Sequence, residues 1–346
     1  MDRDRRIVLS VAGSGKTSLL IDRLDTNRRF LIVTYTDKNT DNIKRRIVRK
    51  FGHQPQNITV YTYFEFLMTV CYRPFFSDRV KARGIDRKMP NPETLKMKRD
   101  KRAFYINPNN DLYHNRIALI CKRSAEAIAK RIEKYYDCFY YDEAQDLDGH
   151  DFDFIREIIP SNVEVIIVGD FFQHTFSTSK DGNTNSTLYD KYERYKGLWK
   201  ETGLDIDTTS LLKSHRCSAS ICDFVRNKIG IEIYSANGNV SEIVEVTDEN
   251  RVENLVADNS IPKLFFQEAS RYNCFAINWG ESKGLDDFTD VCIVLNKKTL
   301  NDYRSDKLQT MAPTSKNKFY VACTRAKRNI YFIPYTLLEK YRKTID

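Results

Sequence analysis

Short apolar runs alternate with segments of helical character along the first half of the chain. Runs rich in Val, Ile, Tyr and Phe predict strands at 6–11, 30–36, 58–61, 138–141 and 163–168. The segments between them predict helices at 16–24, 38–51, 63–72, 116–135 and 152–159. Because these strands are apolar throughout and are separated by helices, we expect a parallel sheet covered on both faces.

The same alternation returns in the second half of the chain. Further strands are predicted at 242–246, 263–266, 274–277, 291–295 and 330–333, with helices between them. A chain of 346 residues is too long for one ordinary core. The pattern therefore predicts two α/β layers joined near 201–209, with a first domain over 1–200 and a second over 201–346.

One segment departs from this alternation. Residues 73–102 carry eleven basic and four acidic side chains, a local balance of +7. Three prolines and Gly84 within it predict neither a regular helix nor a core strand. We interpret it as a basic insertion into the first domain, reaching to about residue 115. It is either a solvated loop or a contact for the phosphate backbone of a nucleic acid, and we prefer the second reading.

Composition places the chain among folded proteins with a basic surface. Lys and Arg number 56 against 47 Asp and Glu, a net charge of +9, and 41% of residues are hydrophobic. No apolar run is long enough to span a membrane, and the charged start lacks the features of a signal peptide, so we expect a cytoplasmic protein without membrane contact. Eight scattered cysteines predict reduced structural thiols. Five histidines without ligand spacing argue against a metal site made of side chains alone.

The first predicted strand runs directly into the sequence Ala-Gly-Ser-Gly-Lys-Thr at 12–17. Glycines at this position let backbone amides converge on phosphate oxygens, and the following helix adds its positive end. Lys16 would reach the β- and γ-phosphates and the Thr17 hydroxyl would hold Mg²⁺. Only the first glycine of the general motif is missing, replaced by Ser10. The candidate nucleotide-binding residues here are Gly13, Ser14, Gly15, Lys16, Thr17 and Ser18.

Acidic residues follow the strand predicted at 138–141. Asp142 is placed to coordinate Mg²⁺ together with Thr17, and Glu143 is placed to polarise an attacking water. A cluster that caps a helix is the alternative. The next strand ends in a second polar cluster at 169–173, and two such clusters beside a phosphate loop favour the catalytic reading.

These motifs, taken together, resemble those of the UvrD/Rep/PcrA group of superfamily 1 helicases in a compact form with reduced accessory domains. In family order they are residues 12–17, 34–38, 61–64, 142–146, 169–173, 211–216, 282–286 and 320–326. The resemblance implies two RecA-like P-loop NTPase domains with parallel sheets and an ATP cleft between them.

The resemblance also assigns roles near the nucleotide. Gln173 would sense the γ-phosphate, and Arg216 and Arg325 would reach it and stabilise its charge. Asp286 stands in place of a family glutamate near the nucleotide, and His215 in place of the tyrosine that stacks on adenine. The implied catalytic residues are Glu143, Gln173, Arg216 and Arg325.

Other positions match family contacts to single-stranded DNA. Aromatic rings suit a motor on arbitrary sequences because every base can stack on them. Packing into the core is the alternative for these rings. With the basic insertion included, the candidate DNA-binding residues are Tyr35, Lys38, Thr62, Phe64, Phe176, Lys96, Lys98, Arg99, Lys101 and Arg102.

Two departures from the family pattern carry predictions. No glutamine precedes the phosphate loop to read adenine, so with His215 we expect a looser choice between ATP and GTP. Only 61 residues separate Arg216 from Asn278, so the second domain is expected to lack a large accessory insertion.

The predicted function is an ATP-dependent DNA helicase or translocase that uses Mg²⁺ and is stimulated by single-stranded DNA. Its partner would be single-stranded DNA or a 3′-tailed duplex, with 3′-to-5′ polarity implied by the family alone. The main alternative is a nucleic-acid-gated ATPase subunit that regulates a partner such as a nuclease, in DNA repair or anti-phage defence, with weak or no unwinding. A DNA-binding module without hydrolysis and a small-molecule P-loop kinase are further alternatives.

Overall fold

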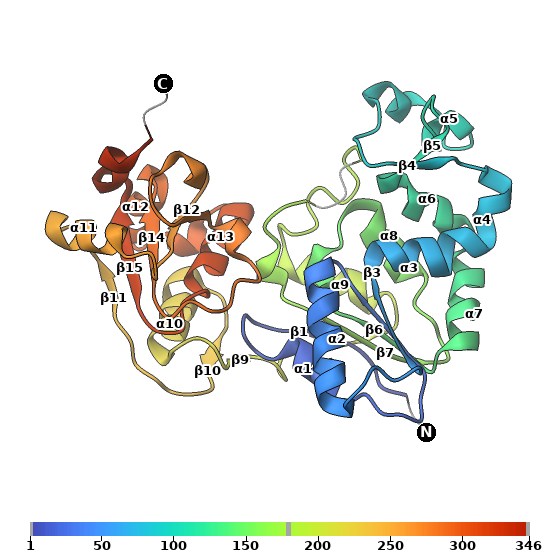
Figure 1. The fold of residues 1–346 in the computed structure, drawn as a ribbon, viewed down its shortest axis with the longest axis horizontal. Helices are drawn as coiled ribbons and strands as arrows, with labels where there is room; N and C mark the ends of the chain where they lie inside the picture. The colour runs from blue at the N-terminus through green and yellow to red at the C-terminus, as the bar shows by residue number, and fades with distance from the viewer. Residues whose placement is uncertain (1–2, 178–180, 344–346) are drawn as a thin grey trace. The chain divides into compact units, whose positions relative to one another are not determined.

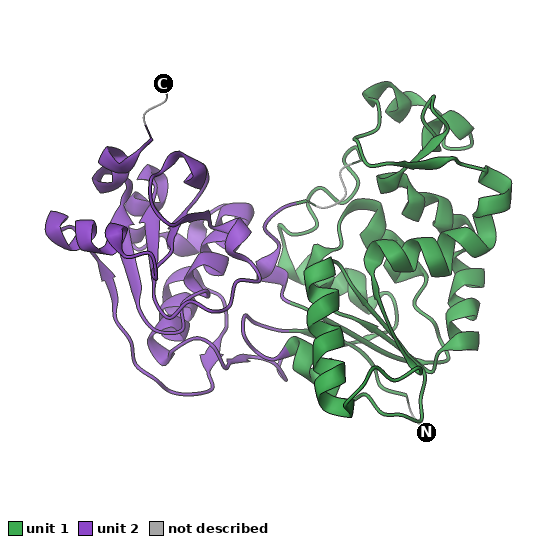
Figure 2. Ribbon diagram, viewed as in Figure 1, with its two compact units in different colours: residues 1–9, 16–169, 177–207 green, residues 10–15, 170–176, 208–346 purple. Residues whose placement is uncertain are grey.

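The computed structural model describes residues 3–177 and 181–343. Contacts divide the chain into two compact units (Figure 2). Unit 1 comprises residues 1–9, 16–169 and 177–207, and unit 2 comprises residues 10–15, 170–176 and 208–346. The domain limits predicted from the sequence, 1–200 and 201–346, stay a prediction.

Unit 1 is built on a six-stranded parallel sheet with the strand order β3-β2-β6-β7-β1-β8. Its strands are β1 (Arg5–Leu9), β2 (Phe30–Thr34), β3 (Ile58–Thr62), β6 (Cys138–Tyr141), β7 (Glu164–Gly169) and β8 (Asp205–Asp207). The predicted parallel sheet is confirmed. The segment 201–209, predicted to join the two layers, also contributes β8, which pairs with β1 as an edge strand.

Helices cover this sheet (Figure 1). They are α1 (Lys16–Asp22), α2 (Asp37–Phe51), α3 (Tyr63–Phe66), α6 (Ile117–Cys121), α7 (Ala125–Tyr135), α8 (Gly149–Glu157) and α9 (Tyr192–Lys200). α2 buries Thr40, Ile43 and Ile47, which share one face because they lie three and four residues apart. The helix predicted over 116–135 is divided by a short 3₁₀ turn at Lys122–Ser124.

The basic insertion has more regular structure than its sequence predicts. It begins in an α-helix, α4 (Arg73–Val80), which corrects the expectation of no regular helix here. Pro74 lies in the first turn, where its missing N–H has no helical partner to lose. Beyond it, β4 (Gly84–Asp86) pairs with β5 (Asp111–Tyr113), and α5 (Arg102–Tyr105) lies between them in sequence. Figure 1 shows β4, β5 and α5 grouped at one end of unit 1.

A fully buried arginine, Arg116, holds the insertion to the rest of unit 1. Its Nε and Nη2 atoms donate to the two carboxylate oxygens of Asp181, at 2.9 and 2.8 Å. Its Nη1 donates to Thr94 Oγ1 at 2.9 Å, and its guanidinium lies 3.9 Å from the centre of the Phe104 ring. His150 Nε2 lies 3.5 Å from the same aspartate. A buried charge needs such partners, so this cluster fixes the base of the insertion.

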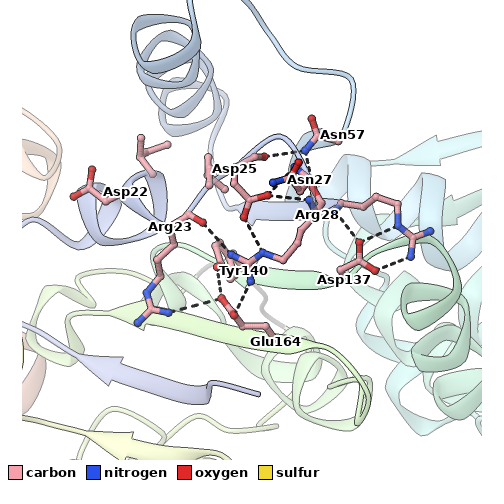
Figure 3. Close-up of polar contacts among 12 residues, drawn as sticks. Asp22, Arg23, Asp25, Asn27, Arg28, Asn57, Asp137, Tyr140 and Glu164 are labelled. Carbon is pink, nitrogen blue, oxygen red and sulfur yellow. Dashed lines mark hydrogen bonds and ion pairs between the residues drawn. The ribbon is translucent and has the colours of Figure 1, made fainter. Parts of the chain in front are cut away.

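A polar network lies at the amino ends of β6 and β7 in the six-stranded sheet (Figure 3). Glu164, the first residue of β7, pairs with Arg28 at 2.9 Å and Arg23 at 3.8 Å, and accepts a hydrogen bond from the Tyr140 hydroxyl. Asp25 accepts from Arg28 Nε at 2.8 Å. These contacts fix the loops at the end of the sheet opposite to Asp142.

Unit 2 contains a five-stranded parallel sheet with the order β11-β15-β14-β12-β13. Its strands are β11 (Ile243–Glu245), β12 (Lys263–Phe265), β13 (Ala276–Asn278), β14 (Val291–Leu295) and β15 (Ile330–Pro334). Its helices are α10 (Ala219–Phe224), α11 (Glu249–Ala257), α12 (Lys297–Arg304) and α13 (Pro313–Cys323). The second predicted sheet is thus confirmed, with β13 beginning two residues later than expected.

Two apolar clusters form the core of unit 2. One includes Trp279, Phe319 and Phe332, and the other includes Phe265 and Ile333. All eight cysteines are free thiols; seven are buried, as expected for structural thiols, and Cys274 is partly exposed. Within the described residues, no helix combines the length and apolar character needed to cross a bilayer.

Candidate nucleotide and nucleic-acid sites

The phosphate loop, residues 10–15, has two glycines in the left-handed region, Gly13 at φ 70° and Gly15 at φ 89°. The Val11 N–H donates to the Leu211 carbonyl at 3.1 Å, and the His215 N–H donates to the Gly13 carbonyl at 2.9 Å. A Cβ added at Gly13 would lie 2.8 Å from both Ser214 Oγ and Arg216 Cβ. Only glycine therefore fits here, and the loop is held by its neighbours in unit 2.

The helix that follows the loop begins in unit 1 with Lys16, which is largely buried. The Thr17 hydroxyl donates to Asp142 Oδ2 at 2.9 Å. Burial and the neighbouring Glu143 raise the pKa of Asp142 to about 7, although Thr17 and Lys16 act in the opposite direction. A hydroxyl and a carboxylate are the oxygen ligands that Mg²⁺ prefers, and this buried carboxylate lacks full charge compensation. The two residues fit a divalent cation.

Glu143 has an unusual backbone, with φ at 62° in the left-handed region. Its N–H donates to Asp142 Oδ1 at 3.0 Å, and its carboxylate accepts from the Gln145 amide. Strained backbone of this kind is concentrated at functional sites, because the surrounding structure must maintain it. The role of Glu143 in activating water stays a prediction.

Gln173 belongs to a hydrogen-bonded chain within unit 2. Its Nε2 donates to Asp170 Oδ2 at 2.8 Å, and the Tyr320 hydroxyl donates to the same oxygen at 3.0 Å. The Tyr320 oxygen in turn accepts from the Ala12 N–H at 2.8 Å. Burial and Asp170 raise the pKa of Tyr320 well above its usual range. The chain joins the phosphate loop to Gln173 through Tyr320 and Asp170, which lie in motifs named from the sequence but received no role there.

The two predicted arginines lie together in unit 2. Arg216 Nη2 and Arg325 Nη1 lie 2.7 and 2.9 Å from the same oxygen, Asp286 Oδ1. Burial and Arg216 lower the pKa of Arg325 to about 10. The structure therefore brings Arg216, Arg325 and Asp286 into direct contact. Two further predicted nucleotide-binding residues lie apart from this contact: His215 is exposed, and the Ser18 hydroxyl in unit 1 accepts from Arg46 Nη1 at 3.0 Å.

A pocket of about 580 Å³ in unit 1 includes three predicted DNA-binding residues in its lining, Tyr35, Thr62 and Phe64. Tyr35 stacks on Tyr63 with ring centres 5.8 Å apart and planes at 11°. The Arg87 guanidinium, from the basic insertion, lies 5.6 Å from the centre of the Phe64 ring. Aromatic faces beside a cation provide a surface suited to unstacked bases.

The remaining predicted contacts do not line this pocket. Phe176 is 56% exposed in unit 2, and Lys38 is exposed at the start of α2. Lys96, Lys98, Arg99, Lys101 and Arg102 are all exposed on the insertion. Arg102 Nη2 donates to the Val80 carbonyl at 2.9 Å and to Asn110 Oδ1 at 2.6 Å, so part of its guanidinium is used within the insertion. Thr62, which does line the pocket, also caps α3, because its hydroxyl accepts from the Glu65 N–H at 3.1 Å.

Family models match most of the chain. Residues 122–334 match the viral superfamily 1 RNA helicase core domain. The chain belongs to the superfamily 1 helicases. Residues 2–107 of this helicase chain match the UvrD/REP helicase N-terminal domain, which confirms the UvrD-like resemblance seen in its motifs. No curated protein sequence matches it.

Solved structures show the same fold. Arterivirus nonstructural protein 10, a helicase, solved with DNA, is 13% identical with a TM-score of 0.52, covering 98% of this helicase chain and 63% of the other. A second structure of the arterivirus protein is 13% identical with a TM-score of 0.51, and the match covers 96% of this chain and 62% of the other. The PRRSV helicase is 14% identical with a TM-score of 0.50, and the match covers 98% of this chain and 54% of the other. The chain thus spans less than two thirds of these proteins. The likeness confirms two RecA-like units.

Proposed function

We propose that this superfamily 1 helicase chain hydrolyses ATP with Mg²⁺ and uses the energy to move along single-stranded nucleic acid. The observation that carries the proposal is the Thr17–Asp142 hydrogen bond, at the start of the helix that begins with Lys16. A phosphate loop, a lysine and a paired hydroxyl and carboxylate form the set that nucleotide hydrolysis requires.

Each side chain has a distinct part in the proposed reaction. Thr17 and Asp142 would hold Mg²⁺, which supplies charge neutralisation for the phosphates when bound. Lys16 binds the β- and γ-phosphates, and Glu143 orients water and accepts its proton. Arg216 and Arg325 stabilise charge on the transferred phosphoryl group.

We propose single-stranded DNA or a 3′-tailed duplex as the substrate, with 3′-to-5′ polarity. The pocket around Tyr35 and Phe64 supports this proposal through its aromatic faces and the cation of Arg87. The matched family model carries the name of RNA helicases, so RNA is the competing substrate. The predicted domains, 1–200 and 201–346, and a cytoplasmic location belong to the same proposal.

A nucleic-acid-gated ATPase subunit that regulates a partner such as a nuclease is the second candidate. The observation that favours it is the short interval between Arg216 and Asn278, which is occupied by unit 2's own elements, among them α10, α11 and β12. Such a subunit would hydrolyse ATP in response to nucleic acid and unwind little or no duplex.

Glu143→Gln tests the proposed function. We expect the variant to bind ATP and nucleic acid as the parent chain does, and to lose turnover by at least about a hundredfold, because its amide cannot accept a proton from water. Steady-state ATPase is measured with no nucleic acid, with single-stranded DNA and with single-stranded RNA. Glu193→Gln, on the exposed face of α9, is the matched control.

Turnover in Glu143→Gln equal to that of the control would refute the catalytic assignment. ATPase that ignores both nucleic acids would refute the motor and favour a small-molecule kinase. Stimulation by RNA alone would transfer the proposal from DNA to RNA.

A further inference from the structure

Asp286 lies where two guanidinium groups of unit 2 converge. Its Oδ1 atom is 2.7 Å from Arg216 Nη2 and 2.9 Å from Arg325 Nη1. The three residues come from separate parts of the unit: Arg216 follows β9 (Lys213–Ser214), Arg325 follows α13, and Asp286 precedes β14. One carboxylate oxygen therefore holds two cations at a common point.

Backbone carbonyls fix both arginines independently of Asp286. Arg216 Nη1 donates to the Thr324 carbonyl at 3.1 Å, and Arg325 Nε donates to the Val321 carbonyl at 3.1 Å. Arg216 also lies beside the phosphate loop, since its Cβ would contact a Cβ placed on Gly13. The positions of the two guanidinium groups are thus fixed before any ligand binds.

The arginine pair has more donors and charge than Asp286 satisfies. Arg325 is 1% exposed, and its Nη2 atom is buried without a hydrogen-bond partner among the described residues. Two cations face a single carboxylate, so one positive charge stays uncompensated by this contact. A buried guanidinium with an unused donor favours an anion with several oxygens, such as a phosphoryl group.

Asp286 differs from its partners in its exposure to water. Its side chain is 53% exposed, against 1% for Arg325 and 13% for Arg216. The residues that follow it, 287 and 288, have no helix or strand before β14 begins at Val291. Rotation of the carboxylate into water does not bury its charge, so the cost of leaving falls on the arginines, which an incoming anion would then satisfy.

We propose that the Asp286 carboxylate is an internal substitute for the terminal phosphoryl group of the nucleotide. It holds Arg216 and Arg325 together while that group is absent and gives way when a triphosphate binds. The inference rests on the proposed ATP hydrolysis and makes Asp286 a positioning residue. A ligand that must displace an internal competitor binds more weakly, in proportion to the fraction of protein in which the competitor has left.

This arrangement predicts a selective effect of Asp286→Asn. Asparagine keeps the size of the side chain and removes its charge, so the arginines are left without their competing anion. A non-hydrolysable ATP analogue should bind about threefold to tenfold more tightly, as expected if the free arginine state is populated at about a third to a tenth. ADP affinity should change less than about twofold, because ADP lacks the competing phosphoryl group.

The experiment compares both nucleotides on the full chain by isothermal titration with Mg²⁺ present. Asp287→Asn is the matched control, since it removes one charge from the next exposed residue and should leave both affinities unchanged. Asp286→Glu keeps the charge and should retain the parent chain's preference between the two nucleotides. Thermal unfolding checks that each variant folds.

Three outcomes would overturn the inference. Equal weakening of both nucleotides would show that Asp286 contacts the nucleoside instead. Unchanged affinities would show a purely structural ion pair, and a gain shared by Asp287→Asn would show a general charge effect. If the parent chain hydrolyses ATP in any of these cases, the proposed function stands and only this inference fails.

Discussion

Tyr320 is fully buried, yet its hydroxyl has two partners in unit 2, the Ala12 amide and the Asp170 carboxylate. A buried hydroxyl that loses its partners is costly, so this placement specifies one arrangement of the phosphate loop and the Gln173 segment. Asp286 likewise fixes the positions of Arg216 and Arg325 through one carboxylate oxygen. Single polar atoms therefore decide where the groups proposed for catalysis lie.

Tyr320→Phe tests the first of these contacts. The ring stays and the hydroxyl is lost, so the Ala12 N–H loses this acceptor and Asp170 loses a donor. Each lost contact costs about 1–3 kcal/mol when the remaining group is buried. We expect kcat of the ATPase to fall about tenfold or more while KM changes less than about threefold, because Gln173 is misplaced but Lys16 is not. Steady-state kinetics measures both constants.

Tyr303→Phe, a partly buried tyrosine elsewhere in unit 2, is the control. A loss of activity in Tyr320→Phe that only matched its loss of folded protein would contradict a positioning role.

At the scale of elements, the insertion is a small structured unit and not a solvated loop. α4, the β4–β5 pair and α5 are joined to unit 1 by Arg116, whose guanidinium contacts Thr94, Phe104 and Asp181. The lysines at 96, 98 and 101 are exposed, and no ion pair is found for them within the described residues. A rigid element with free cations on its surface is suited to a phosphate backbone.

Replacement of Lys96, Lys98 and Lys101 by Gln tests that role. If all three contact phosphates, the slope of log K against log salt should fall by about 2, since each contact with a single strand contributes roughly 0.7. Fluorescence anisotropy with single-stranded DNA at several salt concentrations measures the slope. Intrinsic ATPase should not change, because these residues lie outside the nucleotide motifs.

The control replaces three exposed basic residues of α2, Lys44, Arg45 and Arg49, by Gln. Equal changes in both triple variants would indicate a general charge effect, and no change in either would favour a role in solubility or in binding an acidic protein.

Arg116→Met tests the base of the insertion. Removing one partner of a buried pair leaves Asp181 without its bidentate cation, which costs about 3–5 kcal/mol of unfolding free energy. Burial raises the pKa of Asp181, but hydrogen bonds from His150 and Arg116 lower it by a larger amount. The pKa therefore lies below its usual value. The stabilisation is therefore present above about pH 4 and is lost as pH falls below that value.

Urea unfolding of a Trp279→Phe background measures this effect, because Trp199 then remains as the only tryptophan and lies in unit 1. The difference between Arg116→Met and its parent should shrink from pH 6 towards about pH 3. A difference independent of pH would show that packing of the arginine, and not its charge, supports the insertion.

At the scale of the whole molecule, two parallel α/β units carry the motifs of a superfamily 1 helicase on a chain with a net charge of +9. The charge favours association with nucleic acid of any sequence. The α/β class and family are settled at this scale, whereas direction of movement is a proposal.

The direction of movement along the strand predicts from which end of an oligonucleotide the helicase displaces bound streptavidin. A 3′-to-5′ translocase should displace streptavidin from a 5′-biotinylated oligonucleotide at least about tenfold faster than from a 3′-biotinylated one, in the presence of ATP. Glu143→Gln is the control without turnover. Faster release from the 3′ end would reverse the polarity, and slow release from both ends with normal ATPase would favour the regulatory subunit.

The parallel sheets, the phosphate loop and the acidic pair could all be predicted from the order of residues along the chain. Strand and helix patterns are local, and a motif such as 12–17 is contiguous, so both can be read without a fold. The same reasoning failed for α4, where prolines suggested a break, and for β8, whose three residues form a strand only because β1 lies beside them.

Which distant side chains meet became known only from the folded chain. Ala12 and Tyr320 are 308 positions apart, and Tyr320 and Asp170 are 150 apart, yet each pair is joined by a hydrogen bond. Asp286 is similarly remote from Arg216 in sequence and shares one oxygen with it and Arg325. Contacts of this kind leave no periodic trace along the chain, because they depend on how whole strands and helices pack and not on the spacing of neighbouring residues.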